Sequence, residues 1–145
     1  PLWLYAALCE RLGLATKAPE VALERAPGEV DLAARFNFGG PFSAELCASI
    51  AEDLDREAWL SGEEWTLVIE GKWWNPQHIR WQGGTPPAAW PEDIYLPVQG
   101  GGMQHEADHF TDCIRHRLLD SPWLSHALTR RVLGWVETGL HGAGR

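Results

Sequence analysis

The residues with the clearest capacity for chemistry lie in one short segment, His105-Glu106-Ala107-Asp108-His109. Residues four apart on a helix share a face, so both imidazoles of this His-Glu-x-x-His pattern can reach one metal ion. The glutamate between them then lies beside a metal-bound water and can accept its proton. The pattern therefore predicts a divalent transition metal, zinc or iron, held by His105 and His109, with Glu106 as the general base.

A helix must position these groups, and the sequence predicts one over residues 104–119. At about 100° per residue, a stripe of roughly 60° contains four potential ligands, which are His105, His109, Asp112 and His116. Apolar residues gather on the opposite side, namely Met103, Ala107, Phe110, Ile114 and Leu118. Since an apolar stripe faces a core, the histidine stripe points either into a cleft or into solvent, where it would be an ordinary polar face.

Two histidines alone hold zinc too weakly for a dedicated site, so the prediction requires a third donor. Spacing alone leaves four side chains open for this role, which are His116, Asp112, His78 and Cys113. His78 alternates with apolar residues, a pattern that favours an exposed position on a strand.

The elements around the motif predict an α+β fold in a single domain, residues 1–145, with a small, mostly antiparallel sheet and helices packed on it. Strands are expected at 30–38, which should be central, and at 65–69, 73–81 and 94–98. Helices are expected at 2–12, 44–59 and 122–138, with a short helical turn at 20–24 and a fraying tail at 139–145. The helix predicted at 44–59 makes Cys47 a small core residue.

Composition limits the classes of partner. The net charge is −8, which argues against nucleic acid because phosphate binding needs clustered Lys and Arg. Nine tryptophans are many for 145 residues, and tryptophan is favoured at binding hot spots. Together these features favour a basic protein partner, and they leave the oligomeric state open.

The cysteine pattern and the apolar runs bear on location. Three cysteines without a Cys-x-x-Cys pair do not form a disulfide framework, so a cytoplasmic location is expected. No apolar run approaches the roughly 18 residues of a membrane span, so no membrane association is expected. The apolar opening lacks a basic leader and runs into Glu10 and Arg11, which is not typical of a signal peptide.

The segment Gln104-His105-Glu106-Ala107-Asp108-His109 resembles the Gln-His-Glu-x-Asp-His helix of peptide deformylases, small metalloenzymes that remove the formyl group from nascent chains. In that family a metal-binding cysteine comes from a Glu-Gly-Cys-Leu-Ser segment earlier in the chain. Glu45-Leu46-Cys47-Ala48-Ser49 stands in the same order here. The resemblance implies Cys47 as the third metal ligand.

The resemblance has departures at three positions. Leu46 replaces the family's glycine, and Asp112 stands near another place where the family has glycine. The first family motif is echoed by Gly13-Leu14-Ala15, but Ala18 falls where its glutamine supplies the oxyanion donor.

Two functions from different classes are consistent with these features. The first is a metal-dependent hydrolase of an amide-type bond that uses His105, His109, Cys47 and Glu106. The second is a non-catalytic acidic binding protein, such as an inhibitor or immunity-type partner of a basic protein, with a tryptophan-rich interface. The second predicts that part of a cluster lies on one partly exposed surface, the cluster being Trp65, Trp73, Trp74, Trp81 and Trp90.

Overall fold

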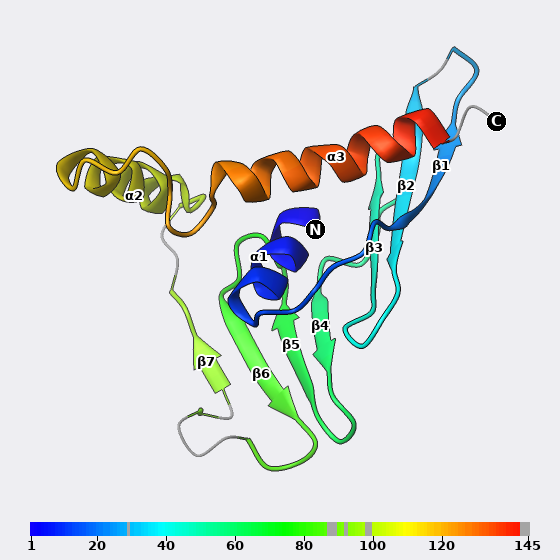
Figure 1. Ribbon diagram of the computed structural model, residues 1–145. Coiled ribbons are helices and arrows are strands. Elements are labelled where there is room, and N and C mark those ends of the chain that lie inside the picture. Colours follow the sequence, from blue (N-terminus) through cyan, green and yellow to red (C-terminus); the bar gives the residue numbers. More distant parts are fainter. Residues whose placement is uncertain (29, 87–89, 92, 98–99, 143–145) are drawn as a thin grey trace. The chain divides into compact units, whose positions relative to one another are not determined.

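A computed structural model describes residues 1–28, 30–86, 90–91, 93–97 and 100–142 (Figure 1). The α+β class is confirmed: within these residues three helices accompany two antiparallel sheets, one of three strands and one of four. The chain divides into two compact units, which we call unit 1 (residues 1–54 and 115–145) and unit 2 (residues 55–114).

Unit 1 combines a three-stranded sheet with two helices. Its elements are α1 (Leu2–Arg11), β1 (Glu20–Arg25), β2 (Asp31–Phe38), β3 (Ala44–Ser49) and α3 (His126–Gly142). The strand order is β1-β2-β3, so the prediction of a central strand at 30–38 is confirmed. Alternation along β2 puts Phe36 and Phe38 on its buried side, where they are 8% and 3% exposed.

The core of unit 1 forms where both helices meet β2. The buried positions of α1 include Tyr5 and Cys9, four apart, and those of α3 are Leu128, Val132 and Trp135. This spacing places one apolar stripe of each helix against the sheet. The Tyr5 ring lies 4.2 Å from Phe38 and its hydroxyl donates to the carbonyl of Phe42 at 3.0 Å. Burial of each such side chain stabilises the fold by about 1.5–3 kcal/mol.

The helix predicted at 44–59 is wrong, because the segment pairs with β2 instead. Leu46 stands directly opposite Phe36 in the antiparallel register, so pairing with a buried partner outweighs the helical spacing of the apolar residues. The strand ends at Ser49, whose hydroxyl accepts hydrogen bonds from the amides of Ala51 and Glu52 at 3.0 Å.

The short helical turn predicted at 20–24 is also wrong. These residues lie in β1, where Val21 pairs with Phe36 and Leu23 with Ala34. Val21 and Leu23 alternate with exposed neighbours, which is the period of a strand with one covered side. Pro19 and Pro27 flank this strand and do not interrupt it.

Unit 2 contains a meander of four antiparallel strands followed by a helix. Its elements are β4 (Ala58–Ser61), β5 (Thr66–Glu70), β6 (His78–Gln82), β7 (Asp93–Tyr95) and α2 (Met103–Arg115). The last residue of α2, Arg115, is assigned to unit 1. The strand predicted at 65–69 corresponds to β5, shifted by one residue, and those predicted at 73–81 and 94–98 correspond to β6 and β7, which are shorter than predicted. Residue 98 lies outside the described part of the chain.

The register of this sheet separates a polar face from an apolar one. Partners across antiparallel strands share a face, so Trp59, Val68, Arg80 and Asp93 form one row. Glu70, His78 and Tyr95 form the next row of the same face. The other face carries Leu60, Leu67, Ile69, Ile79, Trp81 and Ile94.

The predicted helix at 104–119 is confirmed over most of its length and ends at Arg115. Arg117 has φ of 54°, a left-handed conformation that does not continue a right-handed helix. The predicted helix at 122–138 begins later, at His126, and continues to Gly142; residues 143–145 of the predicted tail lie outside the description.

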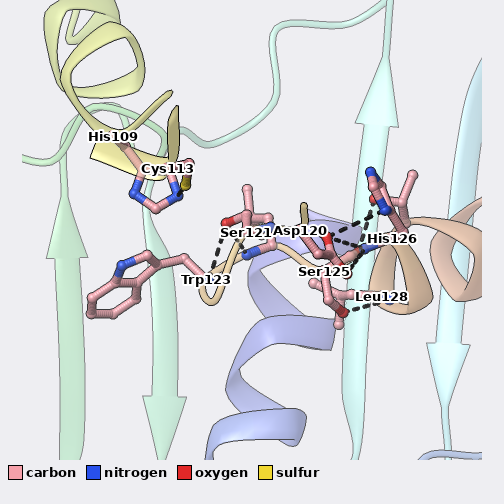
Figure 2. A network of polar contacts seen from close by, with 10 residues as sticks. His109, Cys113, Asp120, Ser121, Trp123, Ser125, His126 and Leu128 are labelled. Atoms are coloured by element: carbon pink, nitrogen blue, oxygen red, sulfur yellow. Dashed lines mark hydrogen bonds and ion pairs between the residues drawn. The ribbon is translucent and has the colours of Figure 1, made fainter. Parts of the chain in front are cut away.

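The late start of α3 has a local cause, shown in Figure 2. The hydroxyl of Ser121 accepts from the amides of Trp123 and Leu124 and closes a separate turn before the helix. The hydroxyl of Ser125 accepts from the amide of Leu128 at 3.1 Å, the bond that an N-cap residue makes. The helix therefore begins after Ser125.

Candidate functional site

The helix α2 carries His105, Glu106 and His109. The amide of His105 donates to the carbonyl of Gly102 at 3.1 Å, in the first turn of the helix. His105 and Glu106 are exposed, whereas His109 is half-buried. The helix is regular across the motif, so the two imidazoles start one turn apart on one side, as the spacing predicted.

A contact within α2 brings Cys113 to His109. The sulfur of Cys113 lies 3.5 Å from Nε2 of His109, one helical turn away, and Figure 2 shows both side chains leaving the helix together. Cys113 is a free, half-buried cysteine. It was one of the four side chains that spacing alone left open as a third donor.

The other proposed donors lie elsewhere. Cys47 is on β3 of unit 1, half-buried, with its sulfur 3.8 Å from a carboxylate oxygen of Glu45. Because Cys47 belongs to unit 1 and the two histidines to unit 2, the ligand set His105, His109 and Cys47 stays a prediction. His116 follows the end of α2 in a turn, while Asp112 lies within the helix. Among the residues that the structure describes, no three His, Cys, Asp or Glu side chains form a group able to hold a metal ion.

His78 instead lies in a network on the polar face of unit 2. Its Nδ1 is 2.7 Å from a carboxylate oxygen of Glu70, and its Nε2 is 2.9 Å from one of Asp93. Both ring nitrogens donate only in the protonated imidazole, so the geometry favours the charged form. Asp93, and then Glu70, accordingly raise the pKa of His78 above the ordinary histidine value.

Two further contacts fix this network. The imidazole of His78 stacks on the ring of Tyr95 with centroids 4.3 Å apart, and Arg80 pairs with Glu70 at 2.6 Å. Sequence reasoning made His78 an exposed strand position and missed the network. The sequence does place Glu70 and His78 on successive predicted strands. Their contact could not be predicted, however, because it depends on the register that makes the two residues direct partners.

Unit 2 carries nearly all of the net charge. Residues 55–114 contain ten Asp or Glu and three Lys or Arg, a formal charge of −7 against −8 for the whole chain. They also contain six of the nine tryptophans. The two features that predicted a protein partner are thus concentrated in one unit.

The tryptophans of unit 2 are not buried. Trp59, Trp74 and Trp90 are 52%, 57% and 47% exposed. Two pairs are held ring against ring: Trp65 stacks on Trp81 at 4.7 Å, and Trp73 meets Trp74 edge-on at 5.6 Å. The predicted partial exposure is confirmed, but the pairs stand at opposite ends of β5 rather than together, because Trp65 precedes this strand and Trp73 follows it.

Unit 1 has a pocket of a different character. Its volume is about 200 Å³ and it is lined from α1, β2, β3 and α3 by apolar side chains, with the thiol of Cys47 among them. No carboxylate or imidazole is among the side chains that line it.

Neither the models of known protein families nor the curated proteins match this sequence. Within the described residues, no helix combines the length and the apolar character needed to cross a membrane.

Proposed function

We propose that unit 2 is a non-catalytic binding module that recognises a basic protein. The observation that carries the proposal is the joint concentration of charge and exposed aromatic surface, −7 and six tryptophans within residues 55–114. Exposed tryptophan gives large apolar contact area with little loss of side-chain freedom, which is typical of hot spots. The acidic surroundings speed the approach of a basic partner and repel acidic proteins.

The surface that best combines both features is the outer strand β4 with the turn after it. We call it the β4 edge and define it by Trp59, Glu63, Glu64 and Trp65. In the strand order β4-β5-β6-β7, β4 is an edge strand of its sheet. Glu63 and Glu64 are exposed beside it.

The β4 edge presents Trp59 on the polar face of the sheet and Trp65 on the other face, and the ring of Trp65 is held in place before a partner arrives. Trp59 stands opposite Val68, which is only 3% exposed although it lies on the polar face. The ring of Trp65 rests on Trp81, and the indole nitrogen of Trp81 donates to the carbonyl of Gly83 at 2.8 Å. Rings that are already ordered lose less entropy on binding, so they contribute more affinity.

The test uses immobilised small proteins of similar size, one group with pI above about 9 and one group that is acidic. The wild-type chain should bind members of the basic group, and the binding should weaken as salt rises because exposed charges are screened. Removing the Trp59 ring in Trp59→Ala should cost about 2 kcal/mol of binding, or about 30-fold. Glu63→Lys with Glu64→Lys should slow association.

Matched controls come from unit 1. Trp3→Ala removes a tryptophan that is 39% exposed, and Glu20→Lys with Glu24→Lys reverses two exposed charges on β1. These variants should bind like the wild type. Equal binding of basic and acidic proteins, or equal loss from Trp59→Ala and Trp3→Ala, would contradict the proposal.

A metal-dependent amide hydrolase is the second candidate. In its favour, α2 is a regular helix across His105, Glu106 and His109, as the resemblance to peptide deformylases requires. His105, His109 and Cys47 would hold the zinc or iron ion, and Glu106 would accept a proton from water. Protein supplied with zinc or iron should then release formate from N-formylated peptides. Glu106→Gln should abolish that release while the neighbouring Asp108→Asn retains it; no release by the wild type would exclude this activity.

A further inference from the structure

The separation of His109 and Cys113 equals that of two ligands on one zinc ion. Zinc lies about 2.0–2.1 Å from imidazole nitrogen and about 2.3 Å from thiolate sulfur, and a tetrahedral angle between these bonds puts the two donors about 3.5 Å apart. Nε2 of His109 and Sγ of Cys113 are 3.5 Å apart. An ion can therefore bind the pair without rearrangement of the helix.

The rest of α2 favours a soft divalent cation at this position. Imidazole with thiolate is a donor set that suits zinc rather than magnesium or calcium. Glu106, Asp108 and Asp112 lie on the same helix, and their negative charges lower the energy of a nearby cation. On binding, the thiol of Cys113 releases its proton to solvent as the sulfur–zinc bond forms.

Two donors leave a zinc ion half coordinated, and the described part of the chain supplies no third. A structural zinc site takes four protein ligands. The helix α2 has no buried residue, and Phe110 and Ile114 are 65% and 61% exposed. At about 100° per residue, His109 and Cys113 lie within about 40° of each other, whereas Phe110 and Ile114 lie about 100° and 140° from His109, on the apolar side of the helix.

We propose that His109 and Cys113 are half of a zinc site that a second copy of this chain completes with the same two residues. Two-fold symmetry brings equivalent residues together, so each copy contributes one histidine and one cysteine to a tetrahedral set. The same contact reaches Phe110, which lies about 60° around the helix from Cys113. The site is independent of the basic partner proposed for the β4 edge.

The experiment titrates the full chain with zinc alone in a phosphine reductant, which keeps Cys113 from forming a disulfide. Calorimetry should give one zinc per two chains, and sedimentation should show the mass double with zinc and return to the monomer with chelator. Cobalt(II) in place of zinc should give a thiolate-to-metal charge-transfer band in the near ultraviolet.

Variants separate this site from the other candidate donors. Cys113→Ala and His109→Ala should lose both the metal and the mass change, whereas Cys47→Ala and His105→Ala should keep them. Cys113→His should restore dimerisation without the thiolate band, which shows that a donor is needed rather than a particular helix packing. Far-ultraviolet circular dichroism checks that each variant folds. Undiminished zinc binding by Cys113→Ala, one zinc per chain without a change in mass, or no zinc binding by the wild type would overturn the proposal.

Discussion

The two units of this chain differ in how many of their apolar side chains are buried. Unit 1 contains eight of the ten buried apolar side chains among the described residues, including Trp135 at 6% exposure. Unit 2 contains the other two, Val68 and Ile69, although it has twice as many tryptophans as unit 1. Its charge of −7 also contrasts with the −1 that remains for unit 1. Buried apolar side chains therefore stabilise unit 1, whereas in unit 2 most of the tryptophan side chains are exposed to solvent.

The most direct test of this difference between the units removes one tryptophan from each. Trp135→Ala deletes a ring that packs edge-on against Phe38 at 4.8 Å, and it should lower the free energy of unfolding by about 3–5 kcal/mol. Trp59→Ala deletes a ring that is 52% exposed, and it should cost less than about 1 kcal/mol. Urea unfolding followed by far-ultraviolet circular dichroism measures both. Equal losses would show that the tryptophans of the two units have the same role.

A smaller effect tests how tightly α3 packs in unit 1. A Cβ added at Gly139 would lie 2.6 Å from Cγ1 of Val21 on β1, and the β-branched valine has little freedom to move. Gly139→Ala should therefore destabilise the protein by about 1–3 kcal/mol, as overpacking does.

Gly134 on the same helix is the matched control. A Cβ there has nothing within 4 Å, so Gly134→Ala should stabilise the protein by about 0.5–1 kcal/mol through helix propensity alone. Thermal unfolding of the two variants should shift in opposite directions. Stabilisation by both would mean that α3 and β1 are not in close contact.

The smallest expected effect concerns pH and unit 2. The pKa of His78 is raised in the folded protein, so its interactions contribute fully below the unfolded value of about 6.5 and are lost as the pH rises through the folded pKa. As the pH rises from about 6.5 through the folded pKa, the urea concentration at the midpoint of unfolding should therefore fall more for the wild type than for His78→Gln. Imidazole resonances followed by NMR give the folded pKa directly. Asp93→Asn should bring it down, and an unchanged value would show that Asp93 is not its main cause.

The sequence predicted the element whose apolar residues recur with the period of the structure that it forms. The alternation at 30–38 is a signal that needs no partner, and this segment forms β2 over residues 31–38. Residues 44–49 failed because their structure depends on β2: Leu46 is buried by pairing with Phe36, and its own neighbours give the period of a helix. Local patterns cannot show a competition that a distant strand decides.

The contacts of the candidate site also differ in whether the sequence could predict them. His109 and Cys113 are four apart on one helix, so the rule that predicted the His105–His109 pair also reaches this contact. The network of His78 depends on which residues of β5 and β7 stand opposite it. That register cannot be read from the periodicity of any one of these strands.

The division of the chain also has a consequence for the order of folding. Residues 55–114 lie between the two segments of unit 1, and Phe38 meets Trp135 across almost a hundred residues of sequence. The strands of unit 2 pair only with sequence neighbours, and such local topologies form quickly. During synthesis the whole meander β4–β7 leaves the ribosome before α3 exists. Until α3 is synthesised, Phe36 and Phe38 lack its cover, so we expect the strands of unit 2 to pair before the core of unit 1 closes.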